Sequence, residues 1–252
     1  MNVPSILRKP SIFDAFANFV LGSDSEQVHD RPLRWGLWAL AVLFCGDVLF
    51  VGVYSVLNNE SLQAVPPMWR LDMDGSFAEM YQYFKFALAA VGCLWLALRW
   101  RQWVLVAWAG LFIALTYDDA MQGHEQIGLA LAGGGWVDDI GPLGANHVGE
   151  LIGFAIIEGA WLMMILVGWW FASQPAARLS VWLLLALGAL VAAGLVIDAM
   201  HAAKILPFQR GLIQLEDGGE MLATSLMLAA VVSASVVAWR TRNVPLPRPS
   251  HA

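Results

Sequence analysis

Six apolar segments, each long enough to cross a lipid bilayer, constrain this chain more than any other feature of its sequence. A membrane-spanning helix needs about 20 consecutive, mostly apolar residues. The segments cover residues 34–57, 78–98, 103–127, 147–172, 179–203 and 217–239. Only 13% of all residues are charged, whereas soluble domains carry roughly 25%. We therefore predict an all-α fold, a polytopic bundle of six transmembrane helices.

Residues that favour turns separate the six segments. Asparagines and prolines lie at 58–59 and 66–67, glycines at 133–135, and single prolines at 175 and 207. No internal repeat is visible, and the loops are too short for a second domain. We predict one transmembrane domain over residues 34–239, a cytoplasmic N-terminal segment over 1–33 and a cytoplasmic tail over 240–252. The apolar side chains of residues 12–21 share a helical face, which favours an amphipathic helix on the membrane surface over disorder.

Arginine and lysine residues are divided unequally between the two sets of helix ends. One set carries Arg8, Lys9, Arg31, Arg34, Arg99, Arg101, Arg178, Arg240, Arg242 and Arg248, and the other carries only Arg70, Lys204 and Arg210. Cytoplasmic loops of membrane proteins are enriched in these residues. We therefore expect both termini in the cytoplasm, the bacterial inner membrane as the location and the lipid bilayer as the main neighbour.

Acidic and histidine side chains gather at the opposite helix ends, away from most of the arginines. Near the outer end of the third segment lie Asp118, Asp119, His124 and Glu125. Seven residues are close to two helical turns, so a continuous helix would place Asp118 and Glu125 on one face. The third segment would then direct two carboxylates the same way.

The fourth segment places His147, Glu150 and Glu158 on one side of a helix. At roughly 1.5 Å per residue, Glu158 would lie about 16 Å deeper in the membrane than His147. A carboxylate at that depth is costly unless it is paired or binds a metal. Glu158 therefore indicates a functional site rather than a solvated surface.

Three other segments add polar residues at the same membrane face. Asp198 and His201 are three residues apart near the end of the fifth segment, Glu220 lies near the start of the sixth, and Glu79 near the start of the second. We expect the third to sixth helices to bring such side chains together in a shared pocket that opens to the periplasmic side.

Carboxylate oxygens combined with a few imidazoles suit divalent metal ions. We therefore predict an integral membrane metal-binding protein, with a metalloenzyme as one form of it. The expected oxygen ligands are Asp118, Glu125, Glu150, Glu158, Asp198 and Glu220, the expected nitrogen ligands are His147 and His201, and Glu79, Asp119 and His124 would hold these ligands in place. A dinuclear iron or manganese site would suit oxidation of a lipid-soluble substrate, and a zinc site would suit hydrolysis by a metal-activated water. The sequence assigns no residue a catalytic role.

Other interpretations of the polar residues stay open. The acids and histidines could form a metal-free network in a transport or accessory protein that handles protons or cations. Asp138, Asp139, Glu216 and Asp217 could be solvated loop acids or helix N-caps. The chain could also be a subunit of a larger membrane complex, with its tryptophan-rich faces against partner proteins. Nucleic-acid binding is not expected, because the basic residues follow the membrane orientation rule and form no patch.

Two further charged residues fall inside apolar segments. Asp47 lies near the middle of the first segment, and Lys85 lies two turns into the second. We expect them to pair, because an ion pair lowers the cost of placing both charges in the membrane. The alternative is that the Lys85 side chain extends to the membrane surface. The inner halves of the segments are otherwise apolar, which argues against a channel through the bundle.

Three short stretches of this sequence resemble a group of uncharacterised bacterial multi-pass membrane proteins. The stretches are LDMDGSFAEMYQYFKF at 71–86, YDDAMQGHEQ at 117–126 and EDGGEML at 216–222. Members of the group carry an Asp-Asp or Asp-Glu pair followed by His-Glu in one helix, and a Glu-rich start to a later one. The resemblance covers the second to sixth segments and implies a multi-pass helical architecture without implying a reaction.

Overall fold

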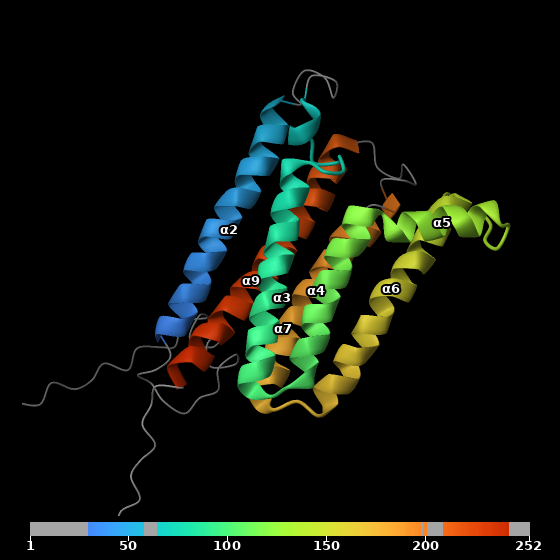
Figure 1. Ribbon diagram of the computed structural model, residues 1–252. Helices are drawn as coiled ribbons and strands as arrows, with labels where there is room; N and C mark the ends of the chain where they lie inside the picture. Colours follow the sequence, from blue (N-terminus) through green and yellow to red (C-terminus); the bar gives the residue numbers. More distant parts are fainter. Residues whose placement is uncertain (1–29, 58–64, 198, 201–208, 242–252) are drawn as a thin grey trace, which may run out of the picture.

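A computed structural model describes residues 30–57, 65–197, 199–200 and 209–241 of the chain. Within these ranges the fold is helical and contains no strand (Figure 1). The expected amphipathic segment at 12–21 and the C-terminal tail from residue 242 lie outside the described residues. The same holds for Asp198 and His201, two of the expected metal ligands.

Long helices account for most of the described chain. They are α2 (Asp30–Leu57), α3 (Phe77–Trp100), α4 (Trp103–Met121), α6 (Ala145–Trp170), α7 (Gln174–Val191) and α9 (Gln209–Thr241). The shorter elements are the 3-10 turn η2 (Pro67–Trp69), helix α5 (Gly123–Gly133) and the π-helical segment η3 (Ala192–Ile197), which continues α7. Six helices are long and apolar enough to span a membrane, with η3 included in the α7 span. The prediction of an all-α, multi-pass architecture is confirmed to that extent.

The third predicted segment ends earlier than expected. Helix α4 ends at Met121, Gln122 adopts a left-handed conformation with φ 52° and ψ 43°, and α5 begins at Gly123. The Asp118 carboxylate accepts a hydrogen bond from the backbone N–H of His124 at 2.8 Å, which satisfies a donor exposed at the start of the new helix. The prediction of one helix through residue 127, with Asp118 and Glu125 on a shared face, is therefore wrong.

The last helix begins before the predicted sixth segment. Helix α9 starts at Gln209 rather than at residue 217, so Glu216 and Asp217 lie within it and are not N-caps. The added turns bury Leu212 and Ile213, which are 2% and 7% exposed. Burial of these apolar side chains stabilises the extension.

Helix α9 is central to the bundle, since it packs against α2, α3, α7 and η3. Helix α4 packs against α3 on one side and α6 on the other, and α5 packs on α6. Figure 1 shows α2 at one edge of the bundle and α6 at the other, with α5 projecting sideways at the end where α6 begins. Large apolar side chains such as Trp38, Leu98 and Trp170 are exposed on the outer surface, as expected where a protein meets lipid.

Candidate functional site

A pocket of about 290 Å³ lies at the end of the bundle where α3 begins and α4 ends. The segment before α3, the start of α3, the last turn of α4 and the N-terminal half of α9 form its walls. Acidic side chains dominate the lining, namely Asp72, Asp74, Glu79, Asp119, Glu216, Asp217 and Glu220. The described lining contains no histidine, cysteine, lysine or arginine. We refer to this cavity as the acidic pocket.

Local structure at the start of α3 fixes one acid at the pocket edge. Ser76 caps the helix, and its hydroxyl oxygen accepts a hydrogen bond from the Glu79 backbone N–H at 3.2 Å. The Glu79 carboxylate in turn accepts hydrogen bonds from the backbone N–H of Gly75 and from the hydroxyl of Tyr83. This reciprocal capping is the local reason why Glu79 points back toward the segment before α3.

An ion pair holds the segment that precedes α3. The Arg70 guanidinium donates to both carboxylate oxygens of Asp72, from Nε at 3.1 Å and from Nη2 at 2.5 Å. This pairing raises the pKa of Arg70 above its usual value, so the guanidinium stays charged. Asp74 accepts a hydrogen bond from the side-chain amide of Gln122, which follows α4. The first contact lies within the segment before α3, and the second connects that segment to the end of α4.

The inner end of the acidic pocket lies between α3 and α9. The Gln82 side-chain amide donates to the Glu220 carboxylate at 3.2 Å. Glu220 packs against Gly194 of η3, where even a methyl side chain would collide with its carboxylate oxygen. π-helical turns are rare and frequently lie at functional sites. Here the π-helical segment and its glycine make room for a pocket acid.

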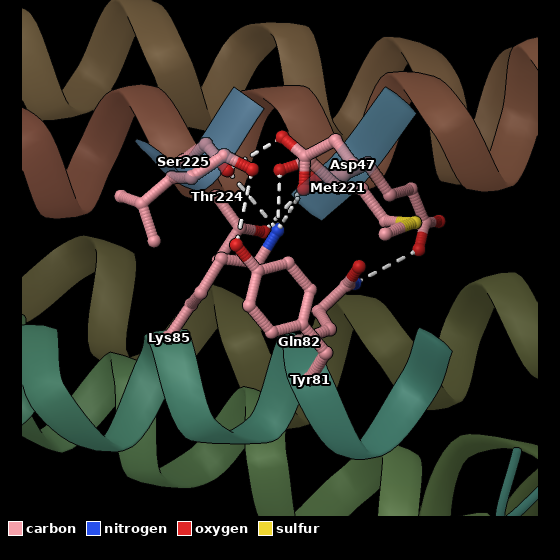
Figure 2. Close-up of polar contacts among 9 residues, drawn as sticks. Asp47, Tyr81, Gln82, Lys85, Met221, Thr224 and Ser225 are labelled. Carbon is pink, nitrogen blue, oxygen red and sulfur yellow. Dashed lines mark hydrogen bonds and ion pairs between the residues drawn. The ribbon is translucent and has the colours of Figure 1, made fainter. Parts of the chain in front are cut away.

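Deeper in the membrane-spanning part, Lys85 of α3 pairs with Asp47 of α2. The Lys85 ammonium donates to the Asp47 carboxylate at 2.9 Å, to the Met221 carbonyl oxygen at 2.7 Å and to the Ser225 hydroxyl at 3.2 Å (Figure 2). The Ser225 hydroxyl donates to the second Asp47 oxygen at 2.7 Å. Lys85 is completely buried and Asp47 is 3% exposed. The predicted ion pair is confirmed, and the alternative of a surface-directed Lys85 is wrong.

The same network shows why this buried lysine is tolerated. Three hydrogen bonds use all three donors of the ammonium, and the Tyr81 ring faces the nitrogen at 4.6 Å from its centroid. A desolvated cation over an aromatic face gains further stabilisation. The network joins α2, α3 and α9. On α3, Lys85 lies one helical turn after Gln82. The acidic pocket and the Lys85–Asp47 pair are therefore neighbouring parts of one polar region.

A second polar cluster lies between α4, α5 and α6. The Asp118 carboxylate contacts Nδ1 of His124 at 2.8 Å as well as its backbone N–H. This hydrogen bond raises the pKa of His124 above its usual 6.5. Glu158 of α6 is 5% exposed, and neither of its carboxylate oxygens has a hydrogen-bond partner. The edge of the His124 ring approaches Phe154, one turn before Glu158.

The remaining predicted ligands lie near the start of α6 and of α5. Nδ1 of His147 lies 3.2 Å from the Glu150 carboxylate, as their spacing of three residues predicts. Glu125 lies in the first turn of α5, where partial burial raises the pKa of its carboxyl. Neither Glu125 nor Glu150 lines the acidic pocket.

The described members of the predicted ligand set thus lie in separate places and not in one shared pocket. Glu220 lines the acidic pocket together with Glu79 and Asp119, whereas Asp118 and His124 form a separate pair. Among the residues that the structure describes, no group of three His, Cys, Asp or Glu side chains is arranged to hold a metal ion.

Sequence reasoning missed Gln82 and Ser225, which connect and complete the polar region. Gln82 lies between Glu79 and Lys85 at helical spacings of three, which was a usable signal. Ser225 and the Met221 carbonyl carried no comparable signal, because their role depends on how α9 packs against α2 and α3.

Comparisons with known proteins give a family and no activity. No curated protein and no solved structure matches the chain. A family model described as a domain of unknown function (DUF8692) matches residues 76–234, well over half of the chain. The matched region contains Glu79, Lys85, Asp119 and Glu220, and Asp47 lies before it. The chain belongs to the DUF8692 family.

Proposed function

We propose that this chain is an integral membrane protein that binds a divalent cation in the acidic pocket. The arginine bias supports a pocket on the periplasmic side of a bacterial inner membrane, with both termini in the cytoplasm. The cation would neutralise carboxylates that the fold holds around one cavity. In this proposal the Lys85–Asp47 pair forms the closed inner end of the site.

One observation carries the proposal, namely that acids from four separate parts of the chain line a cavity of about 290 Å³. Like charges that share a cavity repel one another, and a fold retains such an arrangement only at a cost. A bound cation removes this repulsion. Asp217 adds to the argument, because one of its carboxylate oxygens is buried without a hydrogen-bond partner.

The volume of the pocket favours an ion that keeps its waters. The described residues contain no group of three side chains arranged to hold a metal ion directly, so a bound cation would have to keep most of its water ligands. At about 30 Å³ per water, the cavity would hold a cation with several waters. Magnesium keeps several of its waters in protein sites, and oxygen-only ligands suit Mg²⁺, Ca²⁺ or Mn²⁺. We therefore favour such a hard cation over zinc.

A directly coordinated iron, manganese or zinc centre, and with it a metalloenzyme, stays a prediction from the sequence. Two of its expected ligands, Asp198 and His201, lie outside the described residues. Oxidation of a lipid-soluble substrate by iron or manganese, or hydrolysis by zinc, would each require such a centre.

Cation binding to the full chain in detergent tests the proposal. Mn²⁺ binding is measured by isothermal titration calorimetry and by elemental analysis after gel filtration. We expect stoichiometric Mn²⁺ in the wild type, and at least a tenfold loss of affinity in the double variant Asp119→Asn and Asp217→Asn. Both acids line the pocket, and each amide keeps the size of the acid it replaces.

Asp138→Asn is the matched control, because Asp138 is an exposed acid that does not line the pocket. It should bind Mn²⁺ as the wild type does. The proposal is wrong if the wild type binds no Mn²⁺, or if Asp138→Asn weakens binding as much as the double variant does.

A second candidate function, proton handling without a metal, rests on the buried Lys85–Asp47 pair. Ionisable residues inside membrane-spanning helices commonly mark proton pathways, and Gln82 and Glu220 continue the polar region from this pair to the pocket. On the other side of Lys85, the buried residues of α3 offer no further carboxylate, histidine or cationic side chain; they are Phe86, Ala89, Ala90, Cys93, Leu96 and Ala97. In this candidate, protons that cross the membrane would therefore have to leave the buried face of α3 beyond Lys85.

Proton passage is measured in proteoliposomes that contain the full chain and a pH-sensitive dye. The first candidate predicts no flux above that of empty vesicles. A flux that disappears in the double variant Asp47→Leu and Lys85→Met would favour the second candidate, and would show that the pathway continues beyond Lys85.

A further inference from the structure

A groove of about 630 Å³ lies between α4 and α6, at the end of the bundle opposite the acidic pocket. Its walls include Val106 and Ala107 of α4 and Met163, Met164 and Val167 of α6. Arg101, in the turn between α3 and α4, lies at one end of the groove. The groove is therefore apolar along its length and positively charged at its end.

The groove opens where two membrane-spanning helices meet the membrane surface. Helix α4 begins at Trp103 and α6 ends at Trp170. Trp103, Trp170 and Phe171 are each at least 80% exposed there. Exposed tryptophans at helix ends are typical of the level of the lipid headgroups. The charged end of the groove is thus at headgroup depth, and its apolar part extends toward the hydrocarbon.

The charged end is held in place by backbone and side-chain contacts. Arg101 adopts a left-handed conformation with φ 56°, and its backbone N–H donates to the Ala97 carbonyl. The neighbouring Gln102 side-chain oxygen accepts a hydrogen bond from the Ser173 backbone N–H at 2.8 Å, which ties this turn to the start of α7. The Arg101 side chain is exposed, and no described acid forms an ion pair with it. Its guanidinium is therefore available to an anion.

The apolar walls are suited to a flexible chain. Met163, Met164 and Val167 are 61%, 54% and 59% exposed, whereas Ala107 at the base of the groove is 4% exposed. Methionine side chains adapt to irregular partners. From Met163 to Phe171 the wall extends about 12 Å along α6, at 1.5 Å per residue. These dimensions match part of an acyl chain rather than a compact polar ligand.

We propose that this groove binds one anionic phospholipid, with the headgroup phosphate at Arg101 and an acyl chain along α6. Arginine forms paired hydrogen bonds with phosphate, and basic pockets between transmembrane helices are known sites for acidic lipid headgroups. The opposite charges of Arg101 and the headgroup select an acidic lipid over a zwitterionic one. This site is separate from the acidic pocket and does not depend on cation binding there.

Native mass spectrometry of the full chain tests the proposal. The protein is released from detergent micelles that contain equal amounts of phosphatidylglycerol and phosphatidylcholine. We expect the wild type to retain one phosphatidylglycerol, with at least a fivefold preference over phosphatidylcholine. Arg101→Gln should lose this preference. Met164→Trp, which fills the groove, should lower retention of both lipids.

Arg99→Gln is the matched control, because Arg99 is an exposed arginine in the last turn of α3 that does not line the groove. It should retain phosphatidylglycerol as the wild type does. Equal loss in Arg99→Gln and Arg101→Gln would mean general surface attraction and would overturn the proposal. A dimer that Met164→Trp abolishes, without retained lipid, would assign the groove to a second copy and overturn it as well.

Discussion

At the scale of single residues, the Lys85–Asp47 pair is the most consequential contact in the described chain. Lys85→Met leaves the Asp47 carboxylate buried with Ser225 as its remaining donor. Removing one partner of a buried pair costs about 3–5 kcal/mol of unfolding free energy. We expect a loss of that size in denaturant unfolding of the purified protein in detergent.

The double variant Asp47→Leu and Lys85→Met is the control for that loss. Replacing both charges by apolar groups removes the unpaired charge, so its stability should lie within about 1–2 kcal/mol of the wild type. If the double variant is as unstable as Lys85→Met alone, the loss comes from packing and not from the unpaired carboxylate.

The Asp118–His124 contact predicts a stability that depends on pH. The hydrogen bond raises the pKa of His124 in the folded state above 6.5. A raised pKa means that the stabilisation is fully present below about pH 6.5 and is lost as the pH rises through the folded value. We expect the difference in melting temperature between the wild type and His124→Gln to shrink from about pH 6 to about pH 9. A constant difference over that range would contradict the assignment.

Glu158 predicts a stabilising substitution. Both of its carboxylate oxygens are buried without a partner, and such a group costs about 1–3 kcal/mol. Glu158→Leu should therefore raise the unfolding free energy by roughly that amount, measured in the same denaturant experiment. Glu150→Leu is the comparison, because Glu150 contacts His147, and it should not raise stability. Loss of stability in Glu158→Leu would mean that the carboxylate has a partner in the protein.

At the scale of elements, glycines allow α5 and α6 to pack backbone against backbone. A methyl group at Gly149 would lie 2.7 Å from the Gly128 backbone, and one at Gly153 would lie 2.8 Å from the His124 carbonyl. Both clashes involve backbone atoms that cannot rotate away. We expect Gly149→Ala to separate α5 from α6 and to cost about 1–3 kcal/mol, with faster hydrogen exchange confined to α5.

Gly159→Ala in the same helix is the matched control for this prediction. No atom lies within 4 Å of a methyl group at that position. Alanine is favoured over glycine inside a helix by about 0.5–1 kcal/mol, so this variant should be slightly more stable than the wild type. Equal effects at Gly149 and Gly159 would show that the close contact is not important.

The helix positions follow from the sequence, whereas the break between α4 and α5 does not. Helix positions and the Asp47–Lys85 pair could be predicted, because long apolar runs and the cost of a buried charge leave few alternatives. The end of α4 could not be predicted, because it depends on two local features. The Asp118 carboxylate accepts a hydrogen bond from the backbone N–H of His124 in the next helix, and Gln122 adopts a left-handed conformation. After the break, His124 contacts Asp118, whereas Asp119 lines the acidic pocket.

At the scale of the whole molecule, charge is separated along the bundle. Figure 1 shows that α3 begins at one end of the bundle and passes into α4 at the other. The acidic pocket lies at the first end, and Arg99 and Arg101 lie at the second. The Lys85–Asp47 pair lies between them, and the buried part of α3 beyond Lys85 contains no further charged side chain. This arrangement favours a site that opens to one side of the membrane over a path that connects the two sides.

The separation predicts how the whole protein responds to a cation. Repulsion between the pocket acids destabilises the cation-free fold, so Asp119→Asn with Asp217→Asn should be more stable than the wild type without added cation. Mn²⁺ should stabilise the wild type by about 2.7 kcal/mol at 100 times its dissociation constant. At the same concentration it should stabilise the double variant by no more than about half as much, because a tenfold weaker affinity leaves about 1.4 kcal/mol. Melting temperatures with and without Mn²⁺ measure both effects, with Asp138→Asn as the control that behaves as the wild type. A double variant that is less stable than the wild type, yet stabilised by Mn²⁺ as much as the wild type is, would place the cation elsewhere in the molecule.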